Sequence, residues 1–163
     1  MREIHLTRGQ STIVDDEDYD SLIQWKWFAH LNPSNSFYAT RSSPRNPGPR
    51  GLIWMHRVIM KCPDGMYIDH INKNTLDNRK ANLRICTKSQ NAANSKLRID
   101  NKYGYKGVRY HKKNKNYNAY IRHNGKDIHI GCYNSIIEAA LAYDNKAIEL
   151  FGEFARINYP IYT

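Results

Sequence analysis

Residues 66–98 read MYIDHINKNTLDNRKANLRICTKSQNAANSKLR, and this stretch decides the fold at the centre of the chain. The segment MYID predicts a strand that ends at Asp69 and His70, and LRICT predicts a second strand. The Asn-rich segment INKNTLDNRKAN between them predicts a loop that is too polar to be buried. Thr87 and Gln90 have the spacing of a capping box, so a helix is expected to begin there. The predicted order is strand, loop, strand, helix.

The residue types in this stretch suit phosphodiester hydrolysis. The imidazole of His70 can accept a proton at neutral pH, because its ordinary pKa is about 6.5. A carboxylate such as Asp69 and an amide oxygen such as that of Asn91 are hard ligands of the kind Mg²⁺ takes. Consecutive residues of a straight strand point to opposite faces, so Asp69 and His70 can share a site only where the strand breaks. Taken alone, the Asp-His pair is more typical of a surface pair without function than of a catalytic site.

The whole string closely resembles the HNH motif of phage and mobile-intron homing endonucleases, in DHIN, LDNRKANLR and TKSQNAAN. The resemblance covers most of residues 52–98 and implies a ββα-metal fold. It implies that His70 is the general base, that Asp69 and Asn91 are metal ligands, and that Asn82 holds the connecting loop of the catalytic site by hydrogen bonds. The implied cofactor is Mg²⁺ or Mn²⁺, without any small-molecule cofactor.

Basic side chains of the central stretch are candidates for DNA contact. His56 and Arg57 resemble the upstream His-Arg pair of the same family, and phosphate contact is one interpretation, with a structural role for His56 as the alternative. Arg79 and Arg84 within the motif are further candidates. The four cysteines that some family members use for zinc are absent, and the three present form no C-x-x-C pair, so no structural zinc is expected.

Residues 103–160 predict a three-stranded antiparallel sheet packed on one helix. The runs YGYKGVRYH, NYNAYIRH and KDIHIG alternate with period two, Asn124-Gly125 is a hairpin signal, and a helical pattern follows a capping box at Ser135 and Glu138. The face expected to pack under the helix holds Val108, Ala119, Ile121, Ile128 and Ile130. The opposite, polar face holds Arg109, His111, Asn118, Tyr120, Arg122, Asp127 and His129.

This unit resembles the plant ethylene-response-factor (Apetala-type) DNA-binding domain in YKGVRY, NAYIR and EAALAYDNKAIELFGEFARIN. The resemblance implies that five residues face bases and phosphates: Arg109, His111, Tyr120, Arg122 and His129. In the plant pattern His111 would be Arg, Tyr120 acidic, Asp127 Arg and His129 Trp, so the docking mode carries over but the target sequence does not. Lys112 and Lys113 follow the first strand and are expected to contact phosphates. Surface histidines without a role are the alternative for His111 and His129.

Residues 1–51 predict a small β-rich module. Strands are expected in IHLT, STIV, WKWFAH and FYATR, and the acidic run DDEDYDSLIQ predicts a short helix capped near Asp15. The segment SSPRNPGPRG at 42–51 predicts a linker or loop, in which Arg45 and Arg50 are candidates for phosphate contact. The chain is therefore divided into an N-terminal module (1–51), a nuclease motif (52–98) and a DNA-binding unit (103–160), in the α+β class.

The excess of positive charge lies in the middle of the sequence. The 163 residues carry a formal net charge of +10, of which residues 51–100 contribute +5 and residues 101–132 contribute +7. A basic region interleaved with Tyr, Asn and His suits nucleic acid, although a basic surface kept for solubility is the alternative. No apolar run reaches the roughly 20 residues of a membrane span, and no signal peptide is apparent, so an intracellular, cytoplasmic protein is expected.

The sequence thus favours a site-directed, homing-type DNA endonuclease that hydrolyses a phosphodiester with one divalent metal and a histidine base. Double-stranded host or phage DNA is the expected substrate, and a monomer is favoured. The rival is a non-cleaving, sequence-specific DNA-binding regulator whose central motif is a relic. The intact Asp69, His70 and Asn91 favour the enzyme, because a relic would be free to lose any of them.

Overall fold

The structure is a computed structural model that describes residues 1–43, 51–97 and 100–160. Within these residues it is an α+β protein whose helices cover several small antiparallel sheets. The chain divides into two compact units, Met1–Cys86 and Thr87–Thr163. Arg45 and Arg50 of the Pro- and Gly-rich segment lie outside the described residues.

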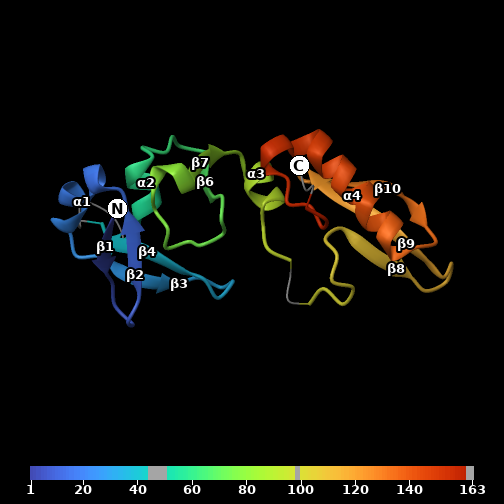
Figure 1. Ribbon diagram of the computed structural model, residues 1–163, viewed down its shortest axis with the longest axis horizontal. Helices are drawn as coiled ribbons and strands as arrows, with labels where there is room; N and C mark the ends of the chain where they lie inside the picture. Colours follow the sequence, from blue (N-terminus) through green and yellow to red (C-terminus); the bar gives the residue numbers. More distant parts are fainter. Residues whose placement is uncertain (44–50, 98–99, 161–163) are drawn as a thin grey trace. The chain divides into compact units, whose positions relative to one another are not determined.

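The first unit opens with a hairpin and a short helix. Strands β1 (Arg2–His5) and β2 (Ser11–Val14) pair antiparallel, as predicted, and helix α1 (Asp16–Ile23) follows them (Figure 1). Asp15 stands at the N-cap position of α1, but its carboxylate does not cap the helix. It accepts a hydrogen bond from the backbone N–H of Lys80 at 2.7 Å, so the acidic run also anchors the central loop.

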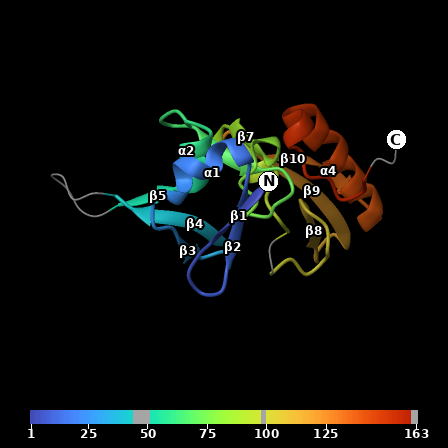
Figure 2. The ribbon, with the colours of Figure 1, turned by 60° about the vertical axis from the view of Figure 1, so that its left-hand side comes forward.

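Three strands form the second sheet of this unit, in the order β3 (Phe28–Leu31), β4 (Phe37–Ser42) and β5 (Leu52–Trp54) (Figure 2). Strand β5 follows the Pro- and Gly-rich segment and pairs antiparallel with β4, which precedes it. The N–H of Ser43 donates to the carbonyl of Gly51 at 2.9 Å next to this pairing. Helix α2 (Met55–Ile59) begins directly after β5.

The central stretch forms the predicted elements. Strands β6 (Tyr67–His70) and β7 (Leu83–Cys86) pair antiparallel, and the short 3-10 helix η1 (Lys80–Asn82) precedes β7. Helix α3 (Lys88–Ala93) begins at a capping box in which both hydrogen bonds between Thr87 and Gln90 are present. The prediction of strand, loop, strand and helix is therefore confirmed.

One hydrophobic cluster supports the whole first unit. Its buried members come from both sides of the Pro- and Gly-rich segment and include Val14, Leu22, Trp27, Met55 and Leu83. Burial of such side chains stabilises a fold by roughly 1.5–3 kcal/mol each. The N-terminal strands and the central motif consequently share a core.

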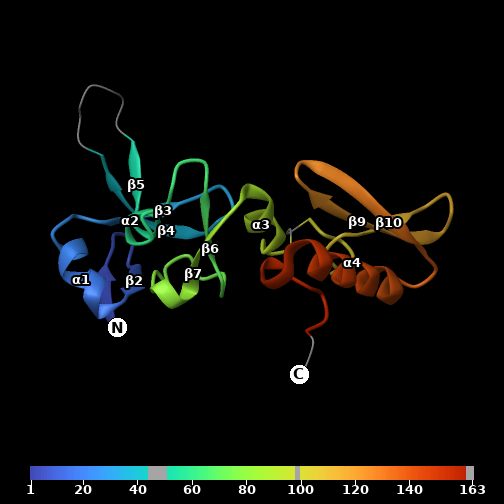
Figure 3. The same cartoon turned by 90° about the horizontal axis from the view of Figure 1, so that it is seen from above.

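The second unit contains strands β8 (Val108–His111), β9 (Asn116–His123) and β10 (Lys126–Tyr133), with β9 in the middle. Helix α4 (Ile136–Phe151) runs along one face of this sheet and ends at the 3-10 helix η2 (Gly152–Phe154) (Figure 3). This arrangement confirms the predicted sheet and helix.

The side chains of the second unit follow the predicted alternation. Val108, Ala119 and Ile121 are buried under α4, and Ile128 and Ile130 are partly buried against the same core. The Asn124-Gly125 hairpin is present, with φ of 49° and 81°. The cap of α4 differs from prediction, because the Ser135 hydroxyl accepts the N–H of Ile137 and forms no reciprocal pair with Glu138.

Candidate active site

His70 is the last residue of β6, and its ring is buried. Its Nε2 lies 3.2 Å from Oδ1 of Asn78, a residue of the loop between β6 and β7. Asn78 is fully buried and donates from Nδ2 to the hydroxyl of Thr12 on β2 at 2.7 Å. The histidine is thereby connected through one amide to the N-terminal hairpin.

This hydrogen-bond chain specifies where the proton of His70 lies. The hydroxyl of Thr12 donates its single proton to the carbonyl of Leu76 at 2.7 Å, because a carbonyl can only accept. Thr12 must therefore accept from Nδ2 of Asn78, which turns the amide oxygen of Asn78 toward His70. An amide oxygen also only accepts, so Nε2 of His70 carries the proton. Nδ1 of the neutral ring is then unprotonated, as a general base requires.

Burial keeps the rings around this position neutral. Burial lowers the pKa of His70, against the opposing effects of the Asn78 hydrogen bond and the charges of Asp69 and Asp77. The ring of His56 lies edge-on to His70 at a centroid distance of 5.3 Å, and its pKa falls to about 3, mainly through burial. The ring of Tyr38 lies 6.1 Å from that of His70, and burial and the charge of Asp69 raise its pKa.

The loop between β6 and β7 contradicts the expectation that it is too polar to be buried. Asp77, Asn78 and Asn82 are only 2%, 0% and 7% exposed. Burial is possible because each side chain is hydrogen-bonded. Asn82 accepts the N–H of Asn72 at 2.9 Å and donates to the carbonyl of Asp77 at 2.8 Å, so its amide spans the loop.

Asp77 anchors the same loop through a two-point ion pair. Nε and a terminal nitrogen of Arg79 lie 2.7 and 2.6 Å from its two carboxylate oxygens. This contact, with that to Asn72, holds the pKa of Asp77 below its ordinary value. The backbone of β2 adds two bonds to the loop, from the N–H of Ile13 to Leu76 and from the N–H of Asn78 to Ile13.

Asp69 lies beside His70 on β6 and opposite Arg84 on β7. Two nitrogens of Arg84 lie 2.9 and 2.8 Å from its Oδ2, and both side chains are largely buried. Asn91 lies on α3, which belongs to the second unit. The structure thus brings Asp69, His70 and Asn82 together in the first unit, and the role of Asn91 stays a prediction.

A divalent cation fits the donor set of one carboxylate and one amide oxygen. No group of three or more His, Cys, Asp or Glu side chains with metal-binding geometry occurs in residues 1–43, 51–97 and 100–160. Mg²⁺ binds through one or two protein oxygens and keeps several waters, so it does not require such a group. Asp69 and Asn91 carry oxygen ligands of this kind, and their binding of a metal stays a prediction.

The candidate DNA-contact residues of the first unit have partners within the protein. His56 is buried, and the guanidinium of Arg57 donates to the carbonyls of Met66 and Pro63 at 2.8 and 3.3 Å. Arg79 and Arg84 are engaged by the two aspartates described above. Contact of these four residues with DNA stays a prediction.

The polar face of the second unit presents its predicted residues to solvent, with one exception. Arg109, His111, Lys112, Lys113, Arg122 and His129 are exposed, and Tyr120 is half-buried. The guanidinium of Arg109 lies 5.1 Å from the centre of the Tyr120 ring, which contacts the His129 ring in a tilted arrangement at a centroid distance of 4.9 Å. The exception is Asn118, which is 8% exposed and whose Oδ1 has no hydrogen-bond partner in the described part of the chain.

Three residues of the site escaped the sequence analysis. Asn78 lies inside the quoted string LDNRKANLR, and that position in the motif was its only signal. Thr12 lies 66 residues before Asn78 in an ordinary strand pattern, and Tyr38 lies on β4. Only the packing of three sheets brings them to His70, so no local pattern could identify them.

None of the helices in the described residues is long and apolar enough to cross a membrane. A family model described as HNH endonuclease matches residues 53–93. An uncharacterized HNH endonuclease of Acanthamoeba polyphaga mimivirus is 40% identical over 161 residues, covering 94% of this chain and 78% of the relative. Protein 3.8 of Escherichia phage T7 is 32% identical over 94 residues, covering 58% of this chain and 77% of the relative. With the strands, loop and histidine of the motif in place, the chain belongs to the HNH endonuclease family.

Proposed function

We propose that this HNH endonuclease is a metal-dependent, site-directed enzyme of the homing type that hydrolyses double-stranded DNA with His70 as its general base. The observation that carries the proposal is the chain of hydrogen bonds from Thr12 through Asn78 to His70. It leaves Nδ1 of a neutral, buried imidazole unprotonated at neutral pH. A surface histidine without function has no need of such support.

In the proposed reaction Nδ1 of His70 accepts a proton from a water molecule as its oxygen bonds to phosphorus. The bond from phosphorus to the leaving sugar oxygen breaks in the same displacement. Asp69 and Asn91 would hold the divalent cation, which neutralises charge that develops on the phosphate and on the leaving oxygen. Asn82 keeps the loop that carries Asn78 in place.

The sheet of the second unit is proposed to select the cleavage site. Arg109, Tyr120, Arg122 and His129 present a cationic and aromatic face, and an arginine on such a face can read guanine in the major groove. His111, Lys112 and Lys113 lie at one end of β8 and would contact phosphates. The net charge of +7 over residues 101–132 supports this assignment.

Nicking of supercoiled plasmid in the presence of Mg²⁺ tests the catalytic assignment. His70→Ala is expected to lower the rate by about 10²–10⁴-fold, the usual effect of losing a general base, while DNA binding stays near wild type. His5→Ala is the matched control, because His5 is an exposed histidine of the same unit. Activity of His70→Ala within about threefold of wild type would exclude His70 as the base. A wild-type protein that binds the plasmid and leaves it intact would instead support the non-cleaving regulator.

Chelation tests the metal. EDTA is expected to stop nicking without changing the circular dichroism spectrum, because Asp69 and Asn91 serve catalysis and the first unit has its own hydrophobic core. Added Mg²⁺ should restore the rate, and Asp69→Asn should raise the Mg²⁺ concentration needed for half-maximal activity. Unfolding by EDTA would contradict the assignment and point to a structural metal.

A further inference from the structure

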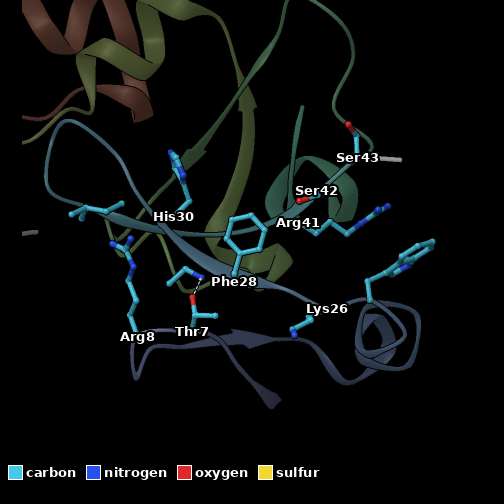
Figure 4. Close-up of a pocket in the computed structure, with 11 residues that line it drawn as sticks. Thr7, Arg8, Lys26, Phe28, His30, Arg41, Ser42 and Ser43 are labelled. Carbon is cyan, nitrogen blue, oxygen red and sulfur yellow. Dashed lines mark hydrogen bonds between the residues drawn. The ribbon is translucent and has the colours of Figure 1, made fainter. Parts of the chain in front are cut away.

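A pocket of about 820 Å³ opens between the β1–β2 turn, the segment before β3, and strands β3 and β4. In Figure 4 Phe28 lies near the centre of the labelled set, with Arg8 and His30 on one side and Arg41 and Ser43 on the other. The N–H of Ala29 donates to the hydroxyl of Thr7 at 3.1 Å and fixes the turn against β3. The pocket is therefore part of the ordered structure of the first unit.

The charges that line this pocket are all positive. Arg8, Lys26 and Arg41 contribute to it, and none of the described residues that line it is acidic. None of these three cations forms an ion pair with a carboxylate of the described residues. By contrast, the acidic residues of α1 are engaged outside the pocket, where Asp20 pairs with Arg2 and Glu17 pairs with Lys80. The pocket is thus a site of unneutralised positive charge.

Arg41 is arranged to receive an anion. Its guanidinium lies 4.0 Å from the centre of the Trp25 ring, which is itself 50% exposed, and 5.7 Å from that of Trp27. Its Nε is buried and lacks a hydrogen-bond partner within the described ranges. A guanidinium that contacts an aromatic ring can also donate hydrogen bonds to a phosphate through its terminal nitrogens.

The pocket lies close to the catalytic histidine. His30 lines it, and the His30 ring contacts that of Trp54 at a centroid distance of 5.5 Å. Trp54 contacts His56 at 5.9 Å, and His56 contacts His70 at 5.3 Å. Since DNA rises by about 3.4 Å per base pair, three such steps correspond to at most about five base pairs. The His30 side of the pocket therefore lies within the length of a short DNA segment from His70.

We propose that this pocket binds the sugar–phosphate backbone of the DNA substrate, within about five base pairs of the phosphodiester next to His70. Arg8, Lys26 and Arg41 neutralise phosphates there, and the apolar surfaces of Trp25 and Phe28 contact the sugars. Phosphate contacts of this kind position a duplex without reading its sequence. The inference rests on the proposed function, because it takes DNA as the ligand and His70 as the catalytic residue.

Binding of a fluorescein-labelled, mixed-sequence duplex to the full chain in EDTA tests the pocket without cleavage. The slope of the logarithm of the association constant against the logarithm of salt concentration counts neutralised phosphates. Arg41→Gln and Lys26→Gln are each expected to flatten this slope by about 0.9. Arg2→Gln changes the net charge equally but lies outside the pocket, so its slope should match wild type.

Tryptophan emission provides a second measurement. Trp25 is the exposed tryptophan of the pocket, so adding duplex should change the emission of wild type and change that of Trp25→Phe much less. Salt slopes for Arg41→Gln and Lys26→Gln equal to that of Arg2→Gln would overturn the proposal. A change of tryptophan emission on adding mononucleotides but not on adding duplex would also overturn it.

The plasmid assay separates this inference from the proposed function. If the salt slopes change as expected while wild type fails to nick plasmid in Mg²⁺, the pocket stands as a DNA contact and the nuclease assignment is wrong. If nicking is normal and the slopes of the pocket variants do not change, the proposed function stands and the pocket assignment is wrong.

Discussion

Thr12 and His70 lie on different strands, and the side chain of Asn78 connects them. Replacing Thr12 by Val should remove both the acceptor for Asn78 and the donor to Leu76. A buried amide left without its partner costs about 1–3 kcal/mol of unfolding free energy, and the amide of Asn78 is then free to turn. We therefore expect Thr12→Val to lose both stability and cleavage rate, as measured by urea unfolding and plasmid nicking.

Thr12→Ser is the matched control for this substitution. Serine keeps the hydroxyl and both of its hydrogen bonds, so the cleavage rate should stay near wild type. A loss of rate in Thr12→Ser together with a wild-type rate in Thr12→Val would show that the methyl group of Thr12, rather than its hydroxyl, supports His70.

The buried imidazole of His56 makes the first unit sensitive to acid. Its pKa is about 3 in the fold against an ordinary 6.5, so the unfolded chain binds the proton first as the pH falls. The stability is complete above pH 6.5 and declines below it by about 1.4 kcal/mol per pH unit for this group. Between pH 7.5 and pH 5, His56→Gln should therefore lose about 2 kcal/mol less unfolding free energy than wild type. Urea unfolding followed by tryptophan emission measures this difference, and equal losses would contradict it.

At the scale of elements, Gly107 fixes the entry to β8. Its φ is 77°, and a Cβ built there would lie 2.0 Å from a ring carbon of Tyr143 and 2.6 Å from the carbonyl of Tyr120. Gly107→Ala is thus expected to separate the sheet from α4. Gly125→Ala is the control, because Gly125 has a similar φ of 81° and open space around it. It should cost only the backbone strain of about 1–2 kcal/mol.

The two units can be followed separately in this experiment. All three tryptophans, Trp25, Trp27 and Trp54, lie in the first unit, whereas α4 is the longest helix and lies in the second. In Gly107→Ala, the unfolding transition seen by helical circular dichroism should occur at a lower urea concentration than the transition seen by tryptophan emission. Coincident, wild-type transitions would show that the sheet accommodates the methyl group.

Much of the element structure was predictable because it depends on local signals. A few neighbouring residues are enough to specify each of three features: the Thr87–Gln90 capping box, the Asn124-Gly125 turn and the alternation of β9. The burial of the loop between β6 and β7 was not predictable, since composition alone suggests exposure. Asp77 can be buried because Arg79 donates hydrogen bonds to its carboxylate, and Asn78 can be buried because its amide donates to Thr12. Thr12 is far from Asn78 in sequence, so this partner could not be predicted locally.

The candidate site divides in the same way. His70, Asp69 and Asn82 are identifiable from a contiguous string, whereas Tyr38 and Thr12 reach His70 through the packing of other sheets. The cap of α1 was mispredicted for a related reason. The carboxylate of Asp15 had two possible partners, and the distant N–H of Lys80 prevailed over the local helix terminus.

At the scale of the whole molecule, the sheet of the second unit and the loop after β8 should differ in their effect on DNA binding. Arg122 is exposed on the proposed reading face, 3.6 Å from Asp127. Arg122→Ala should cost about 1–3 kcal/mol on a target selected from random duplexes and relax preference at a few base pairs. Competition binding with point-mutated duplexes measures both effects.

Lys113→Ala is the companion variant. Lys113 follows β8 in an exposed turn. Its loss should therefore weaken binding to selected and scrambled duplexes alike, and it should flatten the salt slope by about one unit. If Arg122→Ala also weakened binding to all sequences equally, the second unit would bind DNA without sequence preference, and site selection would belong to the first unit.

The hydrogen bond between Thr12 and Asn78 also limits what can be exchanged between related genes. A fragment that begins at residue 52 encodes every residue of the recognised motif, yet it omits the hydroxyl that orients Asn78 and the strand whose Val14 completes the core. Recombination within residues 53–93 alone is therefore expected to give an active hybrid only where the recipient chain supplies a hydroxyl at the position of Thr12. A transferred fragment that carries its own hydroxyl for Asn78 must include β2.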